Sequence, residues 1–175
     1  MQSAAQTLAA ELDAEFPITR RVLERVPTVR LAWQPHAKSM SLGQLAHHLA
    51  QIPGSVSRLA QTDGLDMATR PATYASGEST PAVLATFDQS VLAMKAALAD
   101  LDDARAAAAW RMTFGEREIF TRPRISVMRM LCLNHMIHHR GELVVYLRLL
   151  DVPVPVVYGR SADENPFAQA AIVRA

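Results

Sequence analysis

The chain has 175 residues, half of them hydrophobic and one fifth charged, with a formal net charge of +1 at pH 7. This composition excludes a disordered chain, because it supplies enough apolar side chains for a core, and the length predicts one domain over residues 1–175. The charges are scattered along the chain, so no basic patch indicates binding to nucleic acid or to a membrane surface.

The N-terminus and the cysteine content both indicate a cytoplasmic protein. The first sixteen residues carry acidic side chains and lack the basic stretch and apolar run of a signal peptide. Cys132 is the single cysteine, so an intrachain disulfide is excluded. The most apolar segment, residues 125–150, is interrupted by His, Asn, Arg and Glu, which argues against a membrane span.

The first predicted helix covers residues 3–26. Leu8, Leu12 and Phe16 recur near helical spacing. Pro17 lies inside this pattern and is expected to kink or restart the helix, because proline removes a backbone hydrogen bond and clashes with the preceding turn.

The second predicted helix begins after Ser41. The sequence SLGQ fits a capping box, with Ser41 as the N-cap and Gln44 three residues later. Pro53 is expected to kink or break this helix, and a continuation to Ala60 stays open.

Residues 62–79 are rich in Thr, Ser, Gly and Pro and predict a loop. The third predicted helix starts at Thr80 and Pro81, a capping residue followed by proline at the first helical position, and runs to about Leu101.

The last part of the chain predicts a small hairpin and then a fourth helix. Residues 110–120 alternate in part around Gly115, which favours a hairpin. The helix is expected from Pro123 to Leu150. Four long amphipathic helices predict an all-α fold, an up-down-down-up four-helix bundle with a long crossover and the small hairpin before its last helix.

The segment LNHMIHHRGE, residues 133–142, places three histidines within five positions of the fourth helix. A helix turns 100° per residue, so His135 and His139 share one face, while His138 lies at its margin. The stripe that contains the pair starts with apolar residues and is expected to face the interior. Its members are Met128, Leu131, Cys132, His135, His139, Glu142 and Tyr146.

Two histidines at positions i and i+4 can bind one divalent metal, but a zinc site of catalytic type has three protein ligands. The second helix offers His47 and His48, of which His48 lies beside the apolar stripe and His47 lies further round. Spacing alone leaves two interpretations open, a metal site or hydrogen-bonded histidines at the edge of a core.

Three segments carry a resemblance to a known family. They are WQPHAKSMSLGQLAHHLAQIPG at 33–54, LNHMIHHRGELVVYLRLLDVPVPVVYG at 133–159 and SADE at 161–164. In content, order and separation they are similar to the DinB-like metalloprotein superfamily, also called DinB/YfiT-like. The resemblance implies a four-helix bundle, a homodimer, and a divalent metal, zinc or nickel, held by His48, His135 and His139.

Glu142 stands where the family usually has glutamine after Arg-Gly. The resemblance leaves its role open: it can shuttle a proton, accept a hydrogen bond from a ligand histidine, reach the metal, or pair with a cation such as Arg140. Arg140 itself can hold an anionic substrate group or form an ion pair. Gly141 predicts a close approach to a neighbouring helix, and Tyr146 predicts a pocket or core position.

The function implied by the resemblance is metal-dependent chemistry on a small molecule. In the first hypothesis the three-histidine metal activates a low-molecular-weight thiol for transfer to a small electrophile. In the second the protein is a hydrolase that uses metal-bound hydroxide, which gives Glu142 a role as a base. In the third it is a stress-response protein that binds a metal or ligand without turnover.

Overall fold

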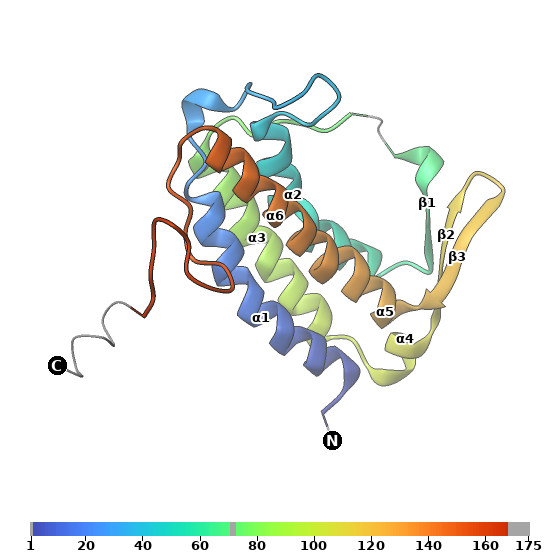
Figure 1. Cartoon of the computed structure of the whole chain (residues 1–175). Coiled ribbons are helices and arrows are strands. Elements are labelled where there is room, and N and C mark those ends of the chain that lie inside the picture. Colours follow the sequence, from blue (N-terminus) through green and yellow to red (C-terminus); the bar gives the residue numbers. More distant parts are fainter. Residues whose placement is uncertain (1, 71–72, 168–175) are drawn as a thin grey trace.

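Four long helical segments lie side by side in the computed structural model, which describes residues 2–70 and 73–167 (Figure 1). The fold is mostly helical with a small three-stranded sheet, so the predicted all-α class is corrected. The long segments are α1 (Ala4–Leu23), α2 (Leu42–Leu59), α3 (Thr80–Ala99) and a composite of α5 (Arg124–Met128), a π-helix (Arg129–Asn134) and α6 (His135–Leu149).

Serine side chains cap the first three of these helices. The capping box predicted at Ser41 and Gln44 is confirmed, because each side chain bonds the backbone N–H of the other. An equivalent pair, Ser3 and Gln6, opens α1. The N-cap of α3 is Ser79, one residue before the predicted position, and its hydroxyl accepts from the N–H of Ala82.

Neither internal proline ends its helix. Pro17 lies within α1 and Pro53 within α2, and both helices continue beyond the proline. Pro53 is buried in the core side of α2, where its ring packs as an apolar side chain. Tertiary packing here outweighs the loss of one hydrogen bond.

The predicted hairpin is confirmed and is part of a larger sheet. Strand β2 (Ala109–Phe114) pairs antiparallel with β3 (Arg117–Pro123), and Gly115 in the turn has a φ of 59°. On its other edge β2 pairs in parallel with β1 (Gly64–Asp66). The predicted loop is therefore wrong at β1 and at the following 3-10 helix, Met67–Thr69. Three residues are too short to show alternation, and their partner lies far along the chain.

The sheet is fastened to one end of the helices. Trp110 of β2 is buried and donates from its indole N–H to the carbonyl of Leu59 at the end of α2, 3.2 Å away. A short helix, α4 (Asp103–Ala107), joins α3 to β2. The hairpin continues directly into α5. The packing of Trp110 on the end of α2 therefore also fixes where the last helical segment begins.

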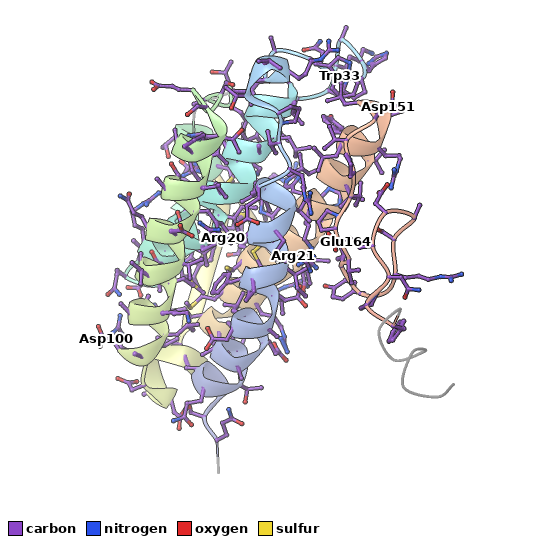
Figure 2. All side chains as sticks on the ribbon, turned by 90° about the vertical axis from the view of Figure 1, so that its left-hand side faces the viewer. Arg20, Arg21, Trp33, Asp100, Asp151 and Glu164 are labelled. Atoms are coloured by element: carbon purple, nitrogen blue, oxygen red, sulfur yellow. The ribbon has the colours of Figure 1, made fainter. Side chains whose placement is uncertain are left out.

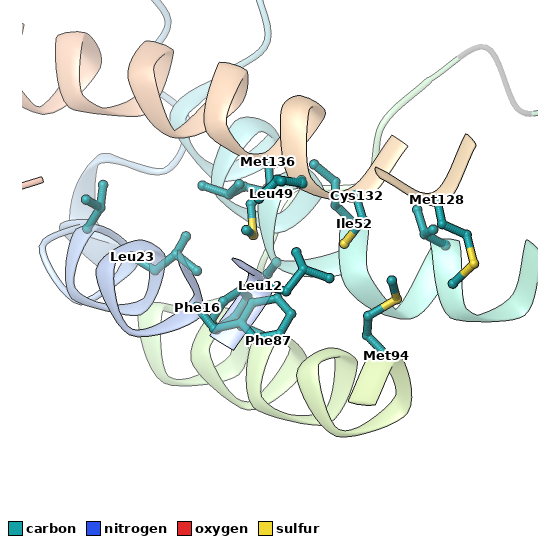
Figure 3. Close-up of a cluster of buried hydrophobic side chains, with 14 of the residues drawn as sticks. Leu12, Phe16, Leu23, Leu49, Ile52, Phe87, Met94, Met128, Cys132 and Met136 are labelled. Atoms are coloured by element: carbon teal, nitrogen blue, oxygen red, sulfur yellow. The ribbon is translucent and has the colours of Figure 1, made fainter. Parts of the chain in front are cut away.

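Buried apolar side chains from all four long segments form the main core (Figure 3). Aromatic contact is part of it, since the rings of Phe16 and Phe87 meet edge to face at 6.1 Å. The labelled side chains point inward from each segment and are Leu12, Phe16 and Leu23 of α1, Leu49 and Ile52 of α2, Phe87 and Met94 of α3, and Met128, Cys132 and Met136 of the last segment.

Helix α3 is the one helix in the described ranges whose length and composition would suffice to cross a membrane. One third of its most apolar window is buried inside the protein. Its buried side chains, among them Val83, Phe87 and Met94, pack in the core. Core helices often pass the same test, so this is weak evidence for a span.

The SADE segment holds the C-terminal part of the chain against α1 and α6. Glu164 contacts Arg21 of α1 (Figure 2) and Arg25 just after it. Asp163 contacts Arg148 of α6. These arginines and backbone N–H groups keep the pKa values of both carboxyl groups below their usual range. The SADE segment, which is part of the family resemblance, therefore has a structural role.

Candidate metal centre

Three histidines from two helices converge at one point. His48 projects from the middle of α2, while His135 and His139 lie on the first turns of α6. The Nε2 atom of His135 is 3.4 Å from Nε2 of His48 and 2.8 Å from Nε2 of His139. The sequence prediction that two distant segments bring these three side chains together agrees with this geometry.

The spacing of the three nitrogens can be compared with that of a real coordination sphere. A tetrahedral ion with metal–nitrogen bonds of about 2.0–2.1 Å separates its ligand nitrogens by about 3.3–3.4 Å. The His48–His135 distance of 3.4 Å matches this spacing. The His135–His139 distance of 2.8 Å must widen by about half an ångström, which a small ring rotation provides.

Burial keeps His48 and His135 neutral at pH 7. It lowers the pKa of His48 to about 4, helped by the neighbouring His139 and His135 and by the cation of Arg70. The pKa of His135 is also lowered to about 4. Burial is the main cause and the neighbouring His139 adds to it, while the backbone of Leu131 opposes the change. Neutral imidazoles have the free lone pairs that metal binding requires.

A π-helical turn directly precedes His135, where a continuous α-helix was predicted. The backbone N–H of His135 bonds the carbonyls of Cys132 and Met130 and not that of Leu131, four residues back. The Leu131 backbone lies near the ring of His135 and acts to raise its pKa. The Nε2 atom of His135 faces the other histidines, which is the orientation a ligand nitrogen requires. Such turns are frequent at functional sites.

Glu142 contacts the cluster from outside. One carboxylate oxygen, Oε2, lies 2.6 Å from Nδ1 of His139, and the other, Oε1, lies 3.4 Å from Nε2 of the exposed His138. A carboxylate on Nδ1 favours the tautomer that carries its proton there and leaves Nε2 free. Of the predicted roles, this geometry fits the hydrogen bond to a ligand histidine.

Sequence reasoning missed Tyr74. Its ring meets that of His48 edge to face at 4.7 Å, and the side-chain amide of Gln44 donates to its backbone carbonyl at 3.1 Å. Tyr74 lies in a segment without helix or strand, so no periodicity could indicate its position. His47, next to His48, faces Gln51 instead, with 2.8 Å between Nε2 atoms.

Arg140 and Tyr146 are placed away from the cluster. Arg140 is buried and its guanidinium lies 2.6 Å from the carboxylate of Glu15 on α1, so of its two predicted roles the ion pair is confirmed. The ring of Tyr146 packs edge to face on Trp33 at 5.5 Å, and its hydroxyl donates to the carbonyl of Met40. Tyr146 thus has the core position of the two predicted for it.

The close helix approach predicted at Gly141 is wrong. Gly141 is exposed, and a Cβ placed there would meet no atom within 4 Å apart from its chain neighbours and the backbone of its own helix. Gly141→Ala is therefore expected to raise the free energy of unfolding by about 1 kcal/mol, because alanine has the better helix propensity. Urea unfolding followed by circular dichroism measures this change. A loss of stability would contradict it.

Cys132 is fully buried in the core and lies outside the histidine cluster. Burial raises the pKa of its thiol to about 12, so it carries almost no thiolate at neutral pH. Native protein is expected not to react with Ellman's reagent at pH 8, whereas guanidinium-unfolded protein should release one equivalent of chromophore. Rapid reaction of the folded protein would show that the site opens.

The fold and the site together define a mostly helical protein with a histidine cluster that can hold a metal ion. The DinB family model matches residues 1–168, and the chain belongs to the DinB family. No curated protein matches the chain.

Two solved structures show the same fold. One is a DinB-like protein from Bacillus cereus, 20% identical in sequence, with a TM-score of 0.66 over 86% of this chain and 95% of its own. The other is the DinB-like protein YjoA from Bacillus subtilis, 15% identical, with a TM-score of 0.65 over 89% of this chain and 99% of its own. At these identities the likeness concerns the fold alone.

Proposed function

We propose that His48, His135 and His139 bind one divalent metal ion, zinc or nickel, as the centre of an enzyme. The observation that carries this proposal is the convergence of three Nε2 atoms from two helices. The rings of His48 and His135 are kept neutral by burial, and Glu142 holds the remaining nitrogen of His139. A donor set of three neutral imidazoles suits zinc and nickel.

The reaction that we propose is transfer of a low-molecular-weight thiol to a small electrophile. A divalent ion with three protein ligands has an open position, where it can lower the pKa of a thiol and so supply the nucleophile. The chain's own contribution is to hold the three imidazoles in one tautomer and to leave the reacting sulfur accessible. Glu142 serves the first purpose for His139.

Metal-dependent hydrolysis is the alternative, and the position of Glu142 makes it weaker. A hydrolase of this kind needs a carboxylate beside the open position, on the side where the Nε2 atoms converge. Glu142 contacts the opposite nitrogen of His139, Nδ1, and is thereby engaged as a hydrogen-bond acceptor. In the thiol reaction the same carboxylate serves as the hydrogen-bond partner of the ligand His139.

The remaining proposals have separate grounds. The family resemblance implies a homodimer, and the resemblance and the four long segments favour an up-down-down-up bundle. The N-terminal sequence and the single cysteine favour a cytoplasmic location, and the chain length favours one domain over residues 1–175. A stress-response role without turnover is the third hypothesis, and it differs from the enzyme hypotheses in predicting metal binding without activity.

The test is thiol consumption with monochlorobimane by the zinc- or nickel-loaded protein. In this reaction the thiol loses its proton, a sulfur–carbon bond forms, and chloride leaves. We expect a rate well above the uncatalysed one, lost in His135→Ala and retained in His47→Ala, because His47 is turned away from the cluster. A rate that survives His135→Ala contradicts the proposal.

Hydrolysis is assayed in parallel with activated esters and no thiol. If the loaded protein hydrolyses them and Glu142→Gln impairs that activity, the hydrolase hypothesis replaces the thiol hypothesis. Neither activity in a protein that retains its metal supports the non-catalytic hypothesis.

A further inference from the structure

A second set of metal-ligating atoms lies on the surface beside the histidine cluster. Nitrogen and carboxylate donors of His138, His139 and Glu142 all lie within 4.8 Å of one another. His138 and Glu142 are four residues apart on α6 and therefore share one exposed edge of that helix. Their side chains are 62% and 42% exposed, whereas that of His139 is 10% exposed.

Glu142 joins this surface to the interior. Its Oε1 faces Nε2 of His138 at 3.4 Å, while its Oε2 faces Nδ1 of His139 at 2.6 Å. The rings of His138 and His139 are 4.8 Å apart. A single carboxylate thus contacts a solvent-facing histidine and a member of the buried cluster at the same time.

We propose that His138 and Glu142 form an outer divalent-metal site that captures an ion from solvent and delivers it to the cluster of His48, His135 and His139. The delivery part of this inference rests on the proposed function; the outer site itself does not. An imidazole and a carboxylate oxygen are both normal ligands of zinc, and water completes the coordination.

Charge explains why capture should begin here. The cation of Arg70 lies close enough to His48 to lower its pKa. A free cation therefore gains nothing by approaching past Arg70, whereas the carboxylate of Glu142 attracts it. Both Glu142 and the ring of His138 lie next to His139. A cation held by His138 and Glu142 is therefore close to the inner cluster and can move to it past His139.

The strength of the two sites should differ. The outer site offers two exposed side chains, which water competes for, and the inner cluster offers three partly or fully buried ones. The outer site should therefore bind more weakly and empty during dialysis. If His138 and Glu142 formed only an exposed ion pair with each other, the protein would show no weaker equivalent of metal.

The experiment is a zinc titration of metal-free protein against a chromophoric chelator, together with stopped-flow uptake of zinc. Wild-type protein is expected to bind a tight and a weaker equivalent. His138→Ala should lose the weaker equivalent, keep the tight one, and take up zinc about tenfold more slowly, since it lacks the capture site. His36→Ala, which removes an exposed histidine elsewhere, should match wild type.

His48→Ala separates this inference from the proposed function. If the cluster binds metal, this variant loses the tight equivalent and keeps the weaker one. If the cluster binds none, wild type and His48→Ala alike show the weaker equivalent alone, which leaves the outer site standing and removes its delivery role. A wild-type titration without a weaker equivalent, or one that His138→Ala does not change, overturns the outer site.

Discussion

His48→Ala and His135→Ala are each expected to abolish tight metal binding, although the two residues lie on different helices. Wild-type protein should retain about one divalent ion per chain after dialysis, because three converging nitrogens are needed for a stable site. With two nitrogens left, the cluster should bind an ion too weakly to retain it through dialysis. Metal content by mass spectrometry of untagged protein measures the outcome.

His47→Ala is the matched control for this prediction. It removes a histidine from the same helix, one residue from His48, whose ring faces Gln51 rather than the cluster. This variant should keep its metal. Circular dichroism verifies that each variant is folded, so that loss of metal is not loss of structure.

Thermal unfolding gives an independent reading of the same site. Zinc at about a thousand times its dissociation constant should stabilise wild-type protein by about 4 kcal/mol, because the ion binds the folded state alone. His48→Ala and His135→Ala should show no such rise. If wild-type protein gains no stability from zinc or nickel and retains neither ion, the three histidines do not bind metal. They are then hydrogen-bonded histidines at the edge of the core.

Arg140→Met is expected to cause the largest loss of stability among single changes near the site. The guanidinium is buried, 2.6 Å from the Glu15 carboxylate and 3.1 Å from the Thr19 hydroxyl. It also donates to the hydroxyl of Tyr158, which in turn donates to Glu15 at 2.9 Å. Removing the cation leaves a mostly buried carboxylate uncompensated, at a cost of about 3–5 kcal/mol.

In a protein of this size that cost lowers the unfolding midpoint by about 10 °C. Adding Glu15→Gln to Arg140→Met should recover part of the loss, since the uncompensated charge is then gone. Lys95→Met is the matched control: it breaks an exposed pair with Asp13 and should cost at most about 1 kcal/mol. If Arg140→Met and Lys95→Met lower the free energy of unfolding equally, burial does not make the ion pair of Arg140 more important for stability than an exposed pair.

Arg140 illustrates what the helical pattern could not decide. It lies next to His139 in the sequence, so an anionic substrate and an ion pair were both reasonable partners. The helix turns 100° between the two residues, and that rotation directs Arg140 towards α1 and the C-terminal segment. Glu15 lies 125 positions earlier in the chain, so the spacing of residues around Arg140 could not indicate this contact.

The sequence by itself determined the four long helical segments, the N-cap of α2 at Ser41, the hairpin around Gly115 and the shared helix face of His135 and His139. These features depend on local chemistry: apolar spacing along a helix, a side chain that caps its own backbone, and a glycine that turns a strand. The family resemblance then selected His48 over His47, a choice that agrees with the side on which the apolar stripe of α2 lies.

The tertiary structure alone decided how these parts meet. It placed Glu142 on Nδ1 of His139, brought Tyr74 onto His48, paired β1 with a strand far along the chain, and introduced the π-helical turn just before His135. Each of these contacts joins groups whose relative position depends on packing of the whole chain, and propensity within a short window does not encode it.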